Sequence, residues 1–334
     1  MTSLPKLCSE IIATTKAESG PAAGCYQVGR ATFRLHETQP VLAQDVAKHF
    51  PSEKPDAETV DIYLRYDGVF MDCVETALDG RWFQQIETLF TDHGMFGYHN
   101  AETSQFEFFD PRLRTAVRIL PSPDHMPIWE NSSPLSVLAS WINQARGAFL
   151  LHSGLLEVEG NGAMLCGPSG SGKSLLTLAG VRAGMQTVGD DYIIVERHPD
   201  TQNYQAYPFS SKAKQSPAGL AFLSPDDPLI DSQPLNWQGK VVFPLGVTYA
   251  GPLSVNYILA PFIGQAPRIT PANARDTARK LAESTIYQLP GSPRQTLRFA
   301  SQLARDLPVF DFEMGPDVAQ NVQALRRFLT DLKL

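Results

Sequence analysis

The segment GAMLCGPSGSGKSLLTLAG, residues 162–180, decides the fold of this chain. Its apolar run 163–166 predicts a strand, and residues 173–183 are typical of a helix that ends at Gly184. Between strand and helix, residues 167–174 match the pattern GxxxxGK(S/T) completely. This order of elements indicates a phosphate-binding loop. The alternative is a glycine-rich turn that matches by chance, and the flanking strand and helix argue against it.

The phosphate loop consists of Gly167, Pro168, Ser169, Gly170, Ser171, Gly172, Lys173 and Ser174. Its glycines lack a Cβ, so backbone N–H groups can curl around an anion. The start of the following helix adds free N–H donors and partial positive charge. A lysine at this place contacts the β- and γ-phosphates of a nucleoside triphosphate, and the serine hydroxyl ligates Mg²⁺. We therefore expect this loop to bind the phosphates of a nucleoside triphosphate.

The acidic pair, Asp190 and Asp191, follows the phosphate loop after one helix and one short strand. A magnesium-nucleotide enzyme needs a carboxylate at a strand end beside its phosphate loop, to hold the metal or to polarise the attacking group. Two adjacent carboxylates next to apolar strands are costly unless something pairs with them. The alternative is an ordinary Asp-rich turn between two strands.

His152 is a further candidate, on an apolar run before the phosphate loop. The dipeptide Asn161-Gly162 is a strong hairpin signal. A turn there places His152 opposite residues 170–171, where an imidazole could touch a phosphate or an incoming acceptor. The alternative is a core histidine with satisfied hydrogen bonds. Among the basic residues, Lys212 in SSKAK (210–214) is the best candidate to complete a phosphate clamp.

The composition of the 334-residue chain excludes several other classes of protein. A net charge of −7 argues against a nucleic-acid binder, which usually carries a basic face. The cysteines form no CxxC pair and the histidines no HExxH, so neither a disulfide framework nor a zinc site is expected. The N-terminus has no signal-peptide core, and the apolar runs are too short to span a bilayer. These features predict a cytoplasmic protein without a membrane partner, and they leave a homo-oligomer open.

The hydrophobic pattern divides the chain into an N-terminal α+β module, 1–128, and a catalytic module, 129–334, joined by a Pro-rich linker. In the first module, strand-like patterns occur at 26–36, 60–74 (one strand or a pair), 104–110 and 113–121, and a helical pattern occurs at 81–96. The second has helical patterns at 133–149, 272–284, 294–307 and 317–332, with short strands between them. This alternation predicts an α/β domain with a mixed sheet.

The stretch LLHSGLLEVEGNGAMLCGPSGSGKSLLTLAGVRAGMQTVGDDYIIVE, residues 150–196, resembles the core of the HPr kinase/phosphorylase family. That family has a histidine on the strand before its loop, a GxSGxGKS loop, one helix and a paired-aspartate turn. It is structurally akin to ATP-type phosphoenolpyruvate carboxykinases. The chain is also similar to HPr-kinase-like bacterial proteins, often called serine kinases, in GDDY (189–192), SSKAK (210–214), WQGKVVFPL (237–245) and LPGSPRQTLRF (289–299).

The resemblance implies a P-loop kinase domain of the HPr kinase/phosphoenolpyruvate carboxykinase-like type, with ATP in the phosphate loop. It implies Ser174 and Asp191 as Mg²⁺ ligands and Asp190 as general base for the acceptor hydroxyl. It also implies that Lys173 contacts the phosphates and that His152 approaches the accepted phosphate. Two departures are visible: SSKAK replaces the family's glycine-rich segment with its arginine, and the N-terminal module is unlike that of true HPr kinases. HPr itself is therefore not the expected substrate.

We thus expect an ATP-dependent phosphotransferase that acts on a hydroxyl group, a serine of a peptide or protein. Lys173 and Mg²⁺ would keep Asp190 ionised by lowering its pKa. One alternative is a binding module that has lost turnover and uses ATP to set its conformation. Another is a small-molecule kinase, which a closed pocket near Asp190 would favour over an open groove. Fold alone does not choose among these functions.

Overall fold

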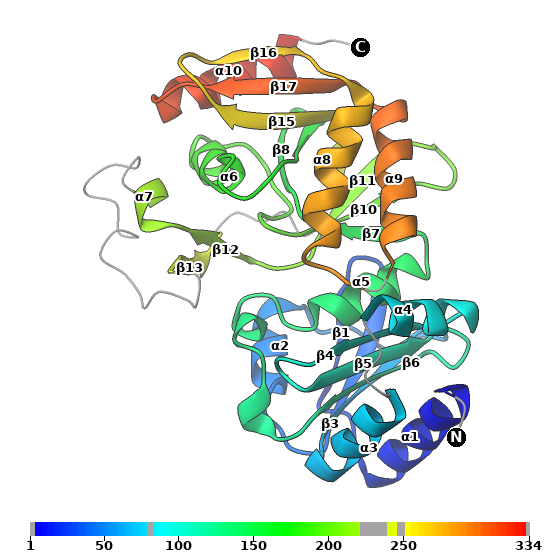
Figure 1. The fold of residues 1–334 in the computed structure, drawn as a ribbon. Helices are drawn as coiled ribbons and strands as arrows, with labels where there is room; N and C mark the ends of the chain where they lie inside the picture. Colours follow the sequence, from blue (N-terminus) through cyan, green and yellow to red (C-terminus); the bar gives the residue numbers. More distant parts are fainter. Residues whose placement is uncertain (1–3, 79–82, 221–238, 246–250, 291, 332–334) are drawn as a thin grey trace. The chain divides into compact units, whose positions relative to one another are not determined.

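The computed structural model describes residues 4–78, 83–220, 239–245, 251–290 and 292–331, which form two compact units (Figure 1). The first unit comprises Met1–Arg146 and Leu289–Ser292, and the second comprises Gly147–Gln288 and Pro293–Leu334. This division falls after Arg146, whereas we placed the module boundary after residue 128. Helix α5 (Ser136–Gln144) accounts for the difference, because its Trp141 stacks on Phe96 of the first unit.

A six-stranded sheet is the centre of the first unit, in the order β1-β2-β3-β6-β5-β4. Its strands are β1 (Gly24–Val28), β2 (Ala31–Glu37), β3 (Val60–Tyr66), β4 (Phe96–Asn100), β5 (Gln105–Asp110) and β6 (Thr115–Leu120). The described helices of this unit besides α5 are α1 (Leu4–Glu18), α2 (Ala43–His49), α3 (Gly68–Leu78) and α4 (Phe83–Asp92), with the short 3-10 helices η1 (Pro123–His125) and η2 (Ile128–Asn131). The helix expected within 81–96 is confirmed over 83–92 as α4, and residues 81–82 lie outside the described residues.

The strand pattern expected over 60–74 is only half correct. The strand ends at Tyr66, and helix α3 begins two residues later. Asp67 stops the strand because its side chain accepts a hydrogen bond from the backbone N–H of Phe70, at 2.9 Å. Such a cap satisfies a donor that the first turn of a helix leaves unpaired.

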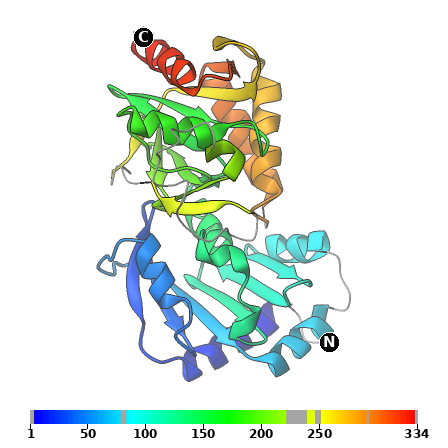
Figure 2. The ribbon, with the colours of Figure 1, turned by 90° about the vertical axis from the view of Figure 1, so that its left-hand side faces the viewer.

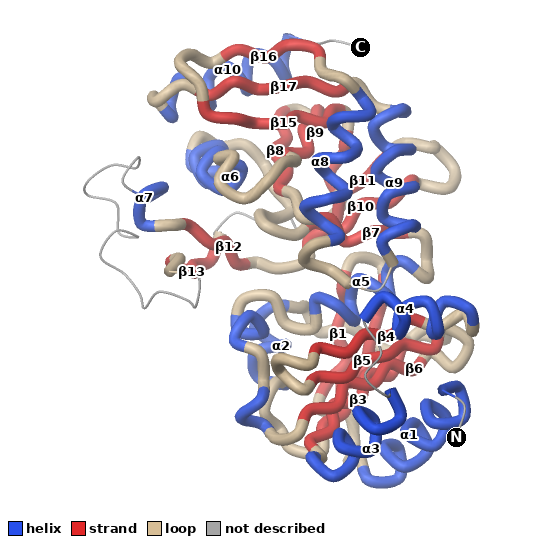
Figure 3. Tube along the Cα trace, viewed as in Figure 1, coloured by secondary structure: helices blue, strands red, loops and turns tan. Residues whose placement is uncertain are grey.

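The second unit contains a mixed five-stranded sheet in the order β16-β17-β15-β9-β8 and a four-stranded sheet in the order β14-β11-β10-β7. The strands are β7 (Ala148–Leu151), β8 (Gly154–Val158), β9 (Asn161–Leu165), β10 (Ile193–Arg197), β11 (Tyr204–Pro208), β14 (Leu253–Val255), β15 (Tyr257–Ile263), β16 (Arg268–Pro271) and β17 (Val309–Met314). Strands β12 (Lys212–Gln215) and β13 (Val241–Pro244) form a separate ribbon (Figure 3). Residues 237–238 and 291, from two of the quoted motifs, lie outside the described residues. The mixed sheet expected for this part of the chain is confirmed.

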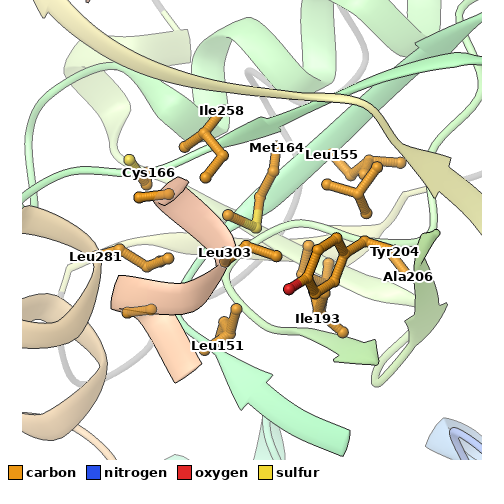
Figure 4. Packing of buried hydrophobic residues seen from close by; sticks show 14 of the residues in the cluster. Leu151, Leu155, Met164, Cys166, Ile193, Tyr204, Ala206, Ile258, Leu281 and Leu303 are labelled. Carbon is orange, nitrogen blue, oxygen red and sulfur yellow. The ribbon is translucent and has the colours of Figure 1, made fainter. Parts of the chain in front are cut away.

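Five described helices belong to the second unit: α6 (Lys173–Arg182), α7 (Pro217–Leu220), α8 (Ala274–Ile286), α9 (Pro293–Asp306) and α10 (Val318–Asp331). Helices α8 and α9 lie on one side of the strands and α10 on the other (Figure 2). One core joins α8 and α9 to both sheets through residues such as Leu281, Leu303 and Met164 (Figure 4). A second core joins α6 and α10 to the five-stranded sheet. The sheet edge that carries the phosphate loop is therefore fixed from both faces.

The hairpin before the phosphate loop turns at Glu159-Gly160, and the expected turn at Asn161-Gly162 is wrong. Val158 pairs with Asn161, so β9 already begins at that asparagine. Glu159 and Gly160 have φ of 53° and 83°, as a two-residue turn of type I′ requires. Gly162 has a different purpose: a Cβ there would overlap the carbonyl oxygen of Ser254 on the neighbouring strand β14.

Candidate functional site

The phosphate loop leaves the end of β9 at a fixed edge of the five-stranded sheet. Strands β9, β15 and β17 run parallel, so their carboxyl ends meet at this edge. Strand β8 runs antiparallel to β9 and begins there, with Gly154 opposite Leu165. The backbone N–H of Cys166 still bonds to Leu259 on β15, at 2.9 Å, before the chain turns into the loop. The loop then passes directly into α6.

Three glycines of the phosphate loop have a left-handed backbone. Their φ values are 142° at Gly167, 83° at Gly170 and 94° at Gly172. A Cβ at Gly172 would overlap the terminal methyl of Met314, whereas a Cβ at Gly170 would enter open space. Gly170 is therefore required by its backbone conformation, and the space beside it is free for a ligand.

Lys173 extends from the first turn of α6 back across the phosphate loop. Its ammonium donates hydrogen bonds to the carbonyl oxygens of Gly167, at 2.7 Å, and Pro168, at 3.1 Å. The residue is 6% exposed. Burial lowers the pKa of Lys173, while the negative charges of Asp190 and Asp191 oppose this shift. The loop thus contains a partly desolvated cation, which interacts with an anion more strongly than a solvated one.

Asp190 is buried, at 3% exposure, and neither of its carboxylate oxygens has a hydrogen-bond partner in the described structure. Gly154 lies next to it: a Cβ there would come within 2.7 Å of Thr177 Oγ1, which is too close, and within 3.4 Å of Asp190 Oδ1, an ordinary contact. Burial and the charge of Asp191 raise the pKa of Asp190 to about 6. The Ser174 hydroxyl, the Lys173 charge and the backbone N–H of Asp191 lie close enough to oppose that rise, although none of them makes a hydrogen bond of normal geometry to the carboxylate. Lys173 does lower the pKa of Asp190, as expected, but burial raises this pKa by more.

Asp191 has the opposite surroundings, although it is the next residue. Its Oδ2 accepts a hydrogen bond of 2.7 Å from Lys214, and its Oδ1 lies 3.4 Å from His152 Nε2. Burial by itself would raise the pKa of Asp191, but Lys214 and His152 hold it well below its usual range. The backbone of Asp191 is left-handed, with φ of 73°, and the N–H of Tyr192 bonds to the carbonyl of Asp190 across it, at 2.9 Å. A non-glycine residue in such a turn is strained.

His152 follows directly on β7, in the four-stranded sheet, and does not lie opposite residues 170–171. The register of the hairpin differs from the expected one, and His152 precedes its first paired residue, Gly154. The backbone N–H of His152 bonds to Thr285 Oγ1, at 3.1 Å, and its ring contacts Asp191. The His152 ring thus contacts the acidic pair, whereas we expected it opposite residues of the phosphate loop.

The sequence pattern favoured Lys212 over Lys214 as the basic residue near the phosphate loop and gave no sign of Gln288, whereas Lys214 and Gln288 both lie at this site. Lys214, not Lys212, pairs with Asp191; the two lysines share a strand and a face, so no pattern in SSKAK separates them. Gln288 follows α8, and its side chain bonds to His152 and Tyr192. No motif marks Gln288, because it comes to the site only through the packing of α8.

The donor set beside the phosphate loop fits Mg²⁺ with a phosphate ligand. Ser171 Oγ and both oxygens of Asp190 are buried and lack partners in the described structure. Among the described residues, no three His, Cys, Asp or Glu side chains gather to hold a metal by themselves. Mg²⁺ is usually held by one or two carboxylates together with substrate phosphates and water. Ser174 and Asp190 suit such a site, whereas the oxygens of Asp191 already face Lys214 and His152.

Comparisons with known proteins add little to this geometry. No protein-family model matches the chain, and no curated protein matches it. Among solved structures, the Hpr(Ser) kinase/phosphatase from Coxiella burnetii matches 55% of this chain and 98% of its own, with 11% identity and a TM-score of 0.28. A likeness at this TM-score supports no inference about fold or activity. We therefore base the function on the residues of the chain itself.

The structure brings most of the predicted site residues to one region of the second unit. Lys173 and Ser174 lie with Asp190 beside the phosphate loop, and His152 lies with Asp191 next to them. Their roles stay predictions. No helix in the described part of the chain is both long enough and apolar enough to cross a bilayer.

Proposed function

We propose that the second unit binds ATP with Mg²⁺ at the phosphate loop and transfers the γ-phosphoryl group to a hydroxyl acceptor, with ADP as the leaving group and the hydroxyl proton released to water. One observation supports this above all. A complete phosphate loop with a buried lysine lies beside Asp190, a buried carboxylate whose oxygens have no described protein partner. An unpartnered buried carboxylate is costly. A cation bound with the nucleotide would supply the missing partner.

Each group then has a separate task. The backbone N–H groups of the loop and the Lys173 ammonium bind the phosphates and neutralise their charge. Ser174 and Asp190 would hold Mg²⁺, which when bound neutralises charge on the β- and γ-oxygens. This departs from the prediction that Asp191 ligates the metal and Asp190 is the general base. Phosphoryl transfer through a loose transition state requires positioning and charge neutralisation more than a strong base.

The metal assignment is tested by Mn²⁺ binding, followed by electron paramagnetic resonance in the presence of ATP. We expect Asp190→Asn to weaken Mn²⁺ binding by about tenfold or more, because it removes an anionic oxygen from the site. Asp191→Asn is the matched control and should weaken it less. If Asp190→Asn binds Mn²⁺ normally but loses phosphoryl transfer, Asp190 returns to the predicted role of general base.

The acceptor, a serine of a peptide or protein, is proposed from the sequence resemblance alone. The test is incubation with ATP labelled at the γ-phosphate and a library of serine peptides, with Lys173→Ala as the negative control. Label in phosphoserine, lost in the variant, supports a serine kinase. Label in a small metabolite would replace the peptide acceptor. Binding of ATP without any transfer would favour a regulatory module and overturn the kinase proposal.

A further inference from the structure

Gln288 connects the acidic pair to helix α8 through two hydrogen bonds. Its Oε1 accepts a hydrogen bond of 2.6 Å from the Tyr192 hydroxyl. Its Nε2 lies 3.0 Å from His152 Nδ1. The opposite ring nitrogen of His152 faces Asp191 Oδ1 at 3.4 Å. A continuous chain of polar contacts therefore runs from Tyr192 to the carboxylate of Asp191.

The two ends of the Gln288 amide are chemically different, and this determines where the His152 proton lies. With Tyr192 donating to Oε1, the amide nitrogen can only donate, so His152 Nδ1 must accept. A neutral imidazole with an accepting Nδ1 carries its proton on Nε2, the nitrogen that faces the Asp191 carboxylate.

The opposite arrangement is unfavourable in this site. If the amide were reversed, a neutral His152 would carry its proton on Nδ1. Its bare Nε2 would then face a carboxylate oxygen at 3.4 Å, with no hydrogen between two acceptors. A doubly protonated His152 would direct its Nδ1–H at the Gln288 amide nitrogen, which also carries hydrogens.

We propose that Gln288 is a positioning residue that fixes the Nε2–H tautomer of His152 and, through it, the orientation of the Asp191 carboxylate. The importance of this orientation for catalysis rests on the proposed function, in which the neighbouring Asp190 holds Mg²⁺. His152 then holds one oxygen of Asp191 and Lys214 the other. These two contacts fix the strained turn from which Asp190 extends toward Ser174. Gln288 itself touches neither nucleotide nor acceptor in this account.

The tautomer is read directly by long-range ¹H–¹⁵N correlation spectra of protein labelled with ¹⁵N-histidine, recorded at pH 8 without nucleotide. The His152 signals are assigned by their loss in His152→Gln. We expect an unprotonated Nδ1 and a protonated Nε2 in the unmodified chain. A proton on Nδ1, or on both nitrogens, would overturn the proposal before any variant at 288 is made.

Two substitutions of Gln288 should change the protonation of His152 Nδ1, each in its own way. Gln288→Glu offers Nδ1 only an acceptor, so a proton should appear on Nδ1. Gln288→Leu removes the donor to Nδ1 and leaves only Asp191 to favour the Nε2–H tautomer, so a minor signal with the proton on Nδ1 should appear beside the main one. Thr285→Val is the matched control, because the Thr285 hydroxyl bonds to the backbone N–H of His152 and not to its ring, so the ring signals should be unchanged. An unchanged His152 spectrum in both Gln288 variants would refute the positioning role.

The kinetic readout separates this inference from the proposed function. Gln288→Glu should lower kcat by about tenfold, as loss of an orienting contact usually does, with the KM for ATP within about twofold of normal. If the unmodified chain transfers no phosphate, the proposed function fails, while the tautomer can still be measured. If the chain is active and the tautomer is as expected, but both Gln288 variants keep full kcat, the positioning role in catalysis is refuted.

Discussion

Asp190 and Asp191 are neighbours in the chain, yet the fold surrounds their carboxylates differently. The left-handed backbone at Asp191 turns the two side chains apart. Asp191 faces Lys214 and His152, whereas Asp190 is buried near Ser174 without a hydrogen-bond partner. An adjacent pair with opposite pKa shifts is common where two acidic groups have different tasks. The two carboxylates should therefore affect the free energy of unfolding in opposite directions.

The pH dependence of unfolding should differ in sign between Asp190→Asn and Asp191→Asn. The pKa of Asp190 is raised from 3.8 to about 6 in the folded chain, so its ionisation costs stability as pH rises through that range. The pKa of Asp191 is lowered, so Asp191 contributes stability above pH 3.8 that is lost as pH falls below it. At pH 7.5, Asp190→Asn should therefore raise the free energy of unfolding by on the order of 2 kcal/mol, and Asp191→Asn should lower it.

Urea denaturation at pH 4 and pH 7.5 measures both effects. The gain in Asp190→Asn should be much smaller at pH 4, where Asp190 is protonated in the unmodified chain. Equal destabilisation by both substitutions at pH 7.5 would contradict the different surroundings derived for the two carboxylates.

The strand, loop and helix at 162–183 could be predicted from sequence because their signals are local. The pattern fixes the loop glycines, and Gly184 ends α6 with φ of 83° as expected. The hairpin turn could not be predicted in the same way. Asn-Gly normally marks a turn, but Gly162 serves the close approach of strand β14, a tertiary contact that the sequence does not encode locally. This error shifted the expected position of His152.

At the level of the loop, Gly170→Ala and Gly184→Ala form a matched pair. Both glycines have φ of 83°, and a Cβ at either enters open space. Each substitution should lower the free energy of unfolding by about 1 kcal/mol, the cost of a left-handed alanine. Only Gly170→Ala should weaken binding of Mg·ATP, by about tenfold, because its methyl group enters the space where a phosphate would lie. Calorimetric titration of both variants decides this, and equal ATP affinities would count against the loop as the binding site.

On the scale of the whole molecule, the α/β character of the second unit followed from alternating short strands and helices. The division between the units could not be predicted in this way, because the Pro-rich segment gives a linker signal at a different place in the chain. Helix α5 lies beyond that segment and still packs in the first unit, and Leu289–Ser292 returns to the same unit from far along the chain. Gln288 directly precedes Leu289–Ser292, and it too is brought to the acidic pair by packing between distant parts of the chain. Such long-range packing leaves no periodic signal in the sequence.

The central claim, that the phosphate loop binds a nucleoside triphosphate through Lys173, is tested most directly by titration calorimetry with Mg·ATP. The unmodified chain, Lys173→Ala and the control Lys48→Ala, at an exposed lysine of the first unit, should be compared after their melting temperatures confirm folding. Loss of a desolvated charged contact of about 2 kcal/mol predicts that Lys173→Ala binds Mg·ATP about 30-fold more weakly, while Lys48→Ala binds normally. Unchanged affinity in a folded Lys173→Ala variant would contradict the account.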